Sequence, residues 1–106
     1  MTDEERKARI EAVNGALNAS DESALLLGGG DIGHPPEAFA EAILGIIWTP
    51  RVSVAYLESK VIEVFMRENA WDEDTAREWY EYNTVRSIQY LSDVDNPPTL
   101  VEDLVY

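Results

Sequence analysis

The sequence RVSVAYL at residues 51–57 runs directly into ESKVIEVFM at residues 58–66. Apolar and small residues alternate in the first stretch, and this alternation predicts a short, half-buried strand. From Glu58 onward the spacing becomes helical and predicts a helix that ends near Asn69. One face of this helix carries four apolar side chains: Val61, Ile62, Phe65 and Met66. A strand followed at once by an amphipathic helix is therefore the centre of the expected fold.

A second helix start follows closely. Asp72 is a good N-cap, and the acidic residues after it suit the positive end of a helix dipole. Trp71 can pack across this cap onto Ala76. We expect the helix to run through Tyr80 towards Leu91, before residues 93–98 break it.

A candidate terminal strand lies at Thr99, Leu100 and Val101. Two helices joined by a tight turn return a chain to its starting side. We therefore expect this strand to pair antiparallel with residues 52–56.

The N-terminal half contains two further helical patterns. Residues 2–19 predict a helix with a narrow apolar stripe, which favours a loosely docked arm. The glycines at 28–30 and 33 predict a loop. Pro35 and Pro36 then open a second helix that we expect to end near Trp48. Its apolar face would carry Phe39, Ala42, Ile43, Ile46 and Ile47.

These elements predict a mainly α (α+β) fold, a small helical domain with a short two-stranded β-sheet. Residues 1–34 would form an N-terminal helical arm and a Gly-rich loop. Residues 35–106 would form a single compact helical core domain with two short strands. Five side chains are expected to be buried together: Phe39, Ile43, Ile62, Phe65 and Tyr80.

Charge restricts the partners. The 106 residues carry a net charge of −13, from 21 acidic and 8 basic side chains, and contain no cysteine. This surface repels nucleic-acid phosphates and anionic lipids and attracts basic protein faces, so we expect no direct nucleic-acid partner and no membrane. The longest apolar run is too short to span a bilayer, and the first residues are not a secretory signal. These features and the missing cysteines favour a soluble, cytoplasmic protein.

Catalytic patterns are weak. The glycines at 28–30 lack the lysine and hydroxyl residue of a phosphate-binding loop, so a hinge is the simpler interpretation. His34 is the only histidine and has no partner at a recognisable spacing. The acids at 72–74 and at 93–95 lack the pattern of a calcium loop, and helix capping explains the first group. We expect no enzyme activity, no metal and no cofactor.

The acidic and aromatic segment at 72–83 is the most unusual part of the chain. On a helix, Ala76, Tyr80 and Asn83 share one face, whereas Trp79, Tyr82 and Arg86 share another. Only one face is needed for the core. The other could be covered as well, or it could bind a partner, because exposed aromatic residues beside acids are typical of interfaces. The partner-binding residues on the second interpretation are Asp72, Glu73, Asp74, Glu78, Trp79, Glu81 and Tyr82.

The blocks FAEAILG at 39–45, Tyr56 leading into KVIEV at 60–64, and DTAREWYEYN at 74–83 resemble a group of small phage and prophage proteins. The resemblance covers roughly residues 37–101. It departs from that group after Asn83, where a glycine-containing segment is usual, and the N-terminal arm is additional. The group has no assigned biochemical activity, so the resemblance implies a setting in a phage-infected cell and no mechanism.

Two functions remain open from the sequence. The first is a phage-encoded interaction protein whose acidic face binds a basic surface of a host protein, with a DNA mimic that blocks a defence or nucleic-acid enzyme as its most specific form. The second is a structural or accessory phage protein that forms a homo-oligomer through the Trp79 and Tyr82 face. On the second hypothesis, acidity serves only solubility.

Overall fold

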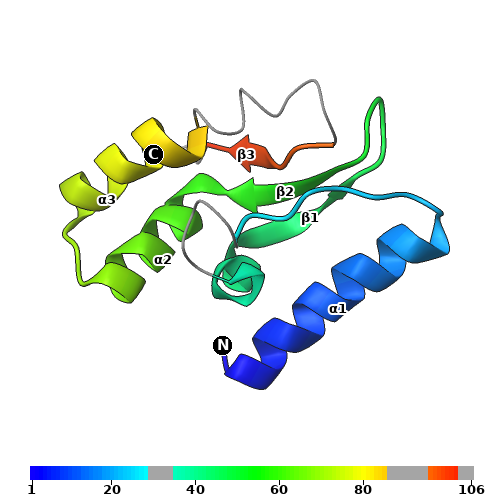
Figure 1. Cartoon of the computed structure of the whole chain (residues 1–106), viewed down its shortest axis with the longest axis horizontal. Helices are drawn as coiled ribbons and strands as arrows, with labels where there is room; N and C mark the ends of the chain where they lie inside the picture. The colour runs from blue at the N-terminus through cyan, green and yellow to red at the C-terminus, as the bar shows by residue number, and fades with distance from the viewer. Residues whose placement is uncertain (29–34, 86–95, 103–106) are drawn as a thin grey trace.

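The computed structural model describes residues 1–28, 35–85 and 96–102. Its elements, in chain order, are α1 (Asp3–Ala19), the 3-10 helix η2 (Pro36–Ala42), β1 (Ile43–Ile47), β2 (Ser53–Leu57), α2 (Glu58–Asn69), α3 (Glu73–Trp79), the π-helix η3 (Tyr80–Val85) and β3 (Thr99–Val101). Figure 1 shows the strands side by side with α2 and α3 beyond one end of them. The mainly α, α+β class is confirmed.

Within the described residues the sheet has three strands in the order β1-β2-β3, so the expected two-stranded sheet is wrong. The additional strand is β1, which lies where the sequence pattern predicted the second half of a helix. The β-branched isoleucines and Gly45 of this segment favour an extended chain. A register shift between Ile43 and Gly45 sets apart the residues that pair with Tyr56 and Ala55 of β2. Because this bulge adds a residue to β1, the spacing of the apolar residues in the strand resembles that of a helix.

β3 pairs parallel to β2, and the expected antiparallel pairing is therefore wrong. α2 begins at the end of β2, and the chain re-enters the sheet beside the start of β2. A long crossover of this kind produces parallel strands. Ser53 of β2 fixes the start of β3 beside it. Its hydroxyl donates to the Pro97 carbonyl at 2.6 Å and lies 2.7 Å from the Thr99 hydroxyl.

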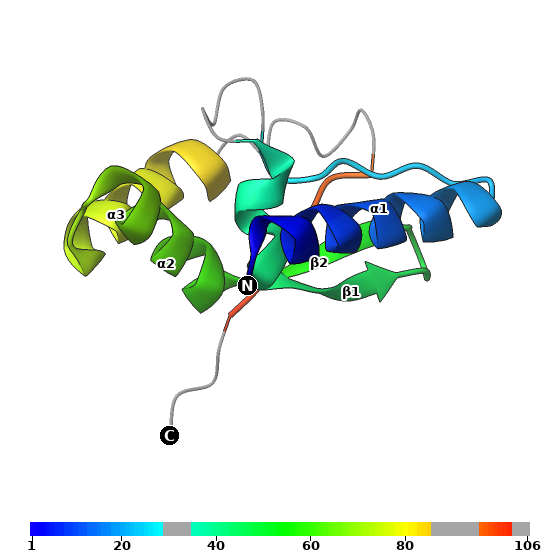
Figure 2. The ribbon, with the colours of Figure 1, turned by 90° about the horizontal axis from the view of Figure 1, so that it is seen from below.

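The helices lie over one face of the sheet and beyond one end of it (Figure 1 and Figure 2). Figure 2 shows α1 and η2 above the strands and α2 and α3 at their end. α1 begins with a capping box between Thr2 and Glu5, and it buries the stripe Ile10, Val13 and Leu17. Arg9 of α1 also donates to the Ala40 carbonyl of η2 at 3.3 Å. α1 is thus docked on the core, while the division of the chain at residue 34 stays a prediction.

The core forms between these helices and the inner face of the sheet. Phe39, Ile62, Phe65 and Tyr80 are buried as expected, whereas Ile43 is half-buried. The rings of Phe39 and Phe65 meet edge to face, with centroids 5.4 Å apart. Such aromatic pairs contribute about 1 kcal/mol beyond the area they bury.

Gly28 is the last described residue before the gap at 29–34. A Cβ added to it would lie 2.7 Å from Cα of Pro36, and its φ is +119°. Glycine is required here because the chain passes close to the backbone that opens η2. The remaining loop glycines, His34, Arg86, the helix extension towards Leu91 and the acids at 93–95 lie outside the described residues.

Tyr56 links the sheet to the segment before this glycine. Its hydroxyl accepts a hydrogen bond from the Leu27 N–H at 3.0 Å. Burial raises the pKa of Tyr56 to about 12, although the Leu27 N–H acts in the opposite direction. The neutral phenol is therefore strongly favoured in the folded protein.

We expect this burial to reduce stability in alkali. The unfolded chain releases the Tyr56 proton near pH 10, whereas the folded chain retains it until about pH 12. The contribution of Tyr56 to the free energy of unfolding is thus fully present below pH 10 and falls by about 2–3 kcal/mol as pH rises to 12. Urea unfolding of the native chain and of Tyr56→Phe should show a stability difference that shrinks across this range. A constant difference would be inconsistent with a buried phenol.

Candidate functional site: an acidic and aromatic face on α3 and η3

Asp72 begins α3. Its side chain accepts a hydrogen bond from the Thr75 N–H at 2.8 Å, and this bond lowers the pKa of Asp72. Ala70, in the left-handed conformation at φ 55°, ends α2 only two residues earlier. The tight connection packs α3 against α2. The predicted N-cap is therefore confirmed, and Asp72 has a structural role at the helix start.

The helix changes to a π-turn at Tyr80, and this change decides which side chains are buried. Ala76, Tyr80 and Thr84 all face the core. Asn83 was expected on that face, but it is only half-buried, and its amide donates to the Trp79 carbonyl at 3.2 Å. A π-turn contains one more residue than an α-turn, so the buried position moves from 83 to 84.

The opposite face of this helix contains a shallow groove of about 280 Å³, lined by Trp71, Thr75, Glu78, Trp79, Tyr82 and Asn83. The rings of Trp71 and Trp79 lie 5.4 Å apart at 48° to each other. Trp79 is 37% exposed and Tyr82 is 62% exposed. Of the two alternatives left open by the sequence, the structure therefore favours an exposed aromatic face among the described residues.

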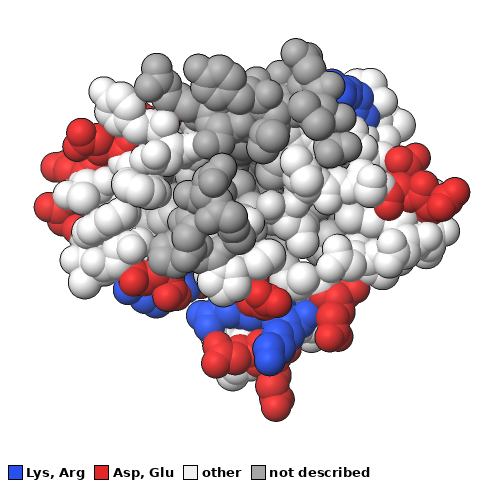
Figure 3. Space-filling model, in the orientation of Figure 1, with Lys and Arg blue, Asp and Glu red and all other residues white. Residues whose placement is uncertain are grey.

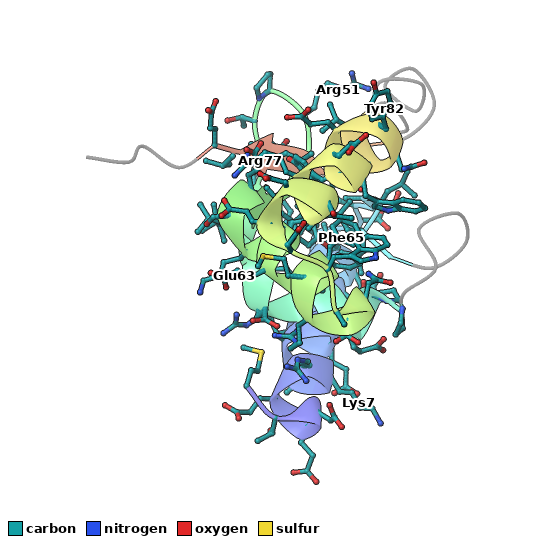
Figure 4. All side chains as sticks on the ribbon, turned by 90° about the vertical axis from the view of Figure 1, so that its left-hand side faces the viewer. Lys7, Arg51, Glu63, Phe65, Arg77 and Tyr82 are labelled. Atoms are coloured by element: carbon teal, nitrogen blue, oxygen red, sulfur yellow. The ribbon has the colours of Figure 1, made fainter. Side chains whose placement is uncertain are left out.

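Arg77 belongs to a separate polar cluster. It lies 3.4 Å from Glu73 and 3.6 Å from Glu58, and Glu58 accepts a hydrogen bond from the Tyr80 hydroxyl at 3.0 Å. Burial, followed by the negative charge of Glu58, raises the pKa of Tyr80. Figure 4 looks onto this end of the molecule and shows Arg77 and Tyr82 on different sides of the helical segment. The Arg77 charge is thus already paired and lies away from the groove.

Other acids of α3 and η3 have no ion-pair partner among the described residues. Within residues 1–28, 35–85 and 96–102, Asp74, Glu78 and Glu81 form no ion pair, and all three are exposed. Their spacing of four and three residues places them along one side of the helix, where Glu78 adjoins the groove. Figure 3 shows acidic atoms at the left-hand edge of the molecule, where Figure 1 places α3.

The seven predicted site residues therefore separate into three groups. Glu78, Trp79 and Tyr82 meet at the groove, Asp74 and Glu81 lie exposed beside it, and Asp72 and Glu73 act in the cap and the Arg77 cluster. The sequence interpretation missed Trp71, Thr75 and Asn83 as lining residues. The spacing of four residues from Trp71 to Thr75 and then to Trp79 was a signal that could have found two of them.

A larger depression, of about 420 Å³, lies between α1 and η2. Its lining includes Lys7 and Arg6, and Arg6 contacts Asp3 at 3.1 Å and Glu41 at 3.6 Å. Charges of both signs thus line it, and its described lining residues include no aromatic side chain. The smaller groove on α3 is the better candidate for a binding site because it combines aromatic rings with an unmatched charge.

The described residues contain no cluster of three or more side chains suited to holding a metal ion. None of the helices in the described ranges has the length and apolar character needed to cross a membrane. The chain matches no protein-family model, no curated protein and no solved structure. The case for function accordingly rests on the geometry of the α3 face.

Proposed function

We propose that this chain is a small, acidic protein-interaction protein that binds a basic surface of another protein through α3 and η3. The observation that carries the proposal is the groove of exposed aromatic rings next to acids that no described cation neutralises. Aromatic side chains supply much of the affinity at protein interfaces, and charges of opposite sign speed the encounter.

The acids and the aromatic rings of this face would act at different distances from the partner. The net charge of −13 attracts a basic partner over about a Debye length, roughly 8 Å at physiological salt. At contact, Trp79 and Tyr82 exclude water from the acids around them, which strengthens each ion pair formed. Binding of this kind weakens as salt concentration rises.

A finer proposal concerns the partner. The resemblance of residues 37–101 to phage and prophage proteins supports a partner in the cytoplasm of an infected host cell. A basic protein surface that binds nucleic acid is the natural complement of this acidic face. The chain would then act as a DNA mimic that occupies the nucleic-acid site of a host defence protein.

The experiment is affinity capture from host lysate at low and at high salt, repeated with an excess of duplex DNA. The proposal expects a basic protein that is released by salt, and the DNA-mimic form also expects release by the duplex. Release by salt but not by the duplex would support the protein interaction and contradict the DNA-mimic form. If only the bait is recovered, and sedimentation shows oligomers at the same concentration, self-association through this face is the better account.

A further inference from the structure

We propose that the groove lined by Trp71, Glu78 and Trp79 binds a single guanidinium group, an arginine side chain of the partner. This inference rests on the proposed function and specifies the chemistry of its central contact. Three observations carry it: the arrangement of the two indole rings, the position of Glu78 and the lack of a lysine or arginine among the described residues of the lining.

The indole rings provide faces for a flat cation. Their centroids are 5.4 Å apart, and their planes are tilted by 48°, so the pair is neither stacked flat nor fully edge to face. A cation is attracted to an indole face when it lies within about 6 Å of the ring centroid. Arginine suits such a site better than lysine because its planar group stacks on aromatic rings and is more weakly hydrated.

Glu78 supplies the matching charge. Glu78 lines the groove together with Thr75, and the described lining residues include no lysine or arginine. Among the described residues, the basic side chain nearest to Glu78 along the helix is Arg77, which Glu58 and Glu73 already hold. A carboxylate beside a ring can accept two parallel hydrogen bonds from a guanidinium group.

Charge also excludes the other ligand classes. An anion would face Glu78 and the acids at 74 and 81, in a protein with a net charge of −13. A neutral apolar side chain could contact the rings but would remove water from Glu78 without replacing its hydrogen bonds. A guanidinium group satisfies the rings and the carboxylate together.

The test uses two short peptides, acetyl-Gly-Arg-Gly-amide and its citrulline analogue, titrated into the native chain and followed by the indole N–H signals in NMR. Citrulline has the shape of arginine without the charge. We expect the arginine peptide to shift the Trp71 and Trp79 signals to saturation and to bind at least tenfold more tightly than the citrulline peptide. Trp48, which is also exposed, is an internal control and should not shift.

Two matched variants make the test specific. Glu78→Gln should weaken binding of the arginine peptide several-fold, whereas Glu11→Gln on the exposed side of α1 should leave it unchanged. Both substitutions retain size and are at exposed positions, so both variants should fold. Equal binding of the two peptides, or equal effects of the two variants, would overturn the guanidinium site.

The outcomes separate this inference from the proposed function. If the arginine peptide fails to bind while a basic protein is still captured in a salt-dependent manner, the guanidinium site is wrong and the proposed function stands. If the peptide binds as expected but no basic protein is captured from the lysate, the site stands and the proposed function is wrong.

Discussion

Replacing Phe65 by alanine should lower the free energy of unfolding by about 3–5 kcal/mol. Phe65 is 1% exposed, and its ring meets that of Phe39 edge to face. The substitution removes both the transfer free energy of the ring and the packing around the cavity that remains. Urea unfolding followed by far-UV circular dichroism measures the change.

Leu44→Ala is the matched control for Phe65→Ala. Leu44 is also a large apolar residue, but it is 54% exposed at the bulge of β1. Its removal should change stability by less than about 0.5 kcal/mol. A loss below 1 kcal/mol for Phe65→Ala, or similar losses for both variants, would show that α2 does not pack as described.

Trp79→Ala should accelerate dissociation of the captured partner by about thirtyfold, which corresponds to a loss of roughly 2 kcal/mol for an aromatic hot spot. Association should change little, because the substitution leaves the charge of the face intact. Surface plasmon resonance with the captured protein separates the two rates.

Trp48→Ala provides the comparison for Trp79→Ala. Trp48 is 43% exposed and follows β1, whereas Trp79 is 37% exposed on α3. The two substitutions remove the same ring from similarly exposed positions. We expect the Trp48 variant to dissociate at the native rate, and equal acceleration in both variants would locate the interface elsewhere.

The strand and helix at residues 51–69 could be predicted from sequence because local pattern and tertiary packing agree there. The alternation before Glu58 and the helical spacing after it correspond to β2 and α2. The Asp72 cap was equally clear, since one side chain and one backbone N–H define it. Four of the five predicted core residues are buried for the same reason.

The strand β1 could not be recognised from its pattern. Five apolar or small residues in a row fit a buried helix as well as a strand, and the bulge at Leu44 moves the apolar positions towards helical spacing. The direction of β3 depends on where the chain re-enters the sheet after α3. That path is a property of the tertiary fold, and no local signal encodes it.

The candidate site was predicted in part. Helical spacing indicated that Trp79 and Tyr82 share a face different from that of Ala76 and Tyr80, but left open whether that face is covered. Both side chains are exposed. The π-turn after Trp79 could not be read from the sequence, and it moved Asn83 out of the buried face and placed it in the lining of the groove. Trp71 was assigned only to the helix cap, although it also contacts Trp79.

Capture of a basic protein at low and high salt by two charge-reversal variants tests the central claim most directly. Glu78→Lys with Glu81→Lys alters the α3 face, and Glu11→Lys with Glu22→Lys alters exposed positions in and after α1. Each pair moves the net charge from −13 to −9, so only the location of the change differs.

We expect the α3 double variant to capture at least about tenfold less partner at low salt than the native chain, and to lose most of the salt dependence of capture. The α1 double variant should capture nearly as much partner as the native chain. Circular dichroism should show both variants folded, because all four positions are exposed. Equal capture by the two double variants would contradict the proposed interface. The acidity of α3 would then serve only the solubility of the protein.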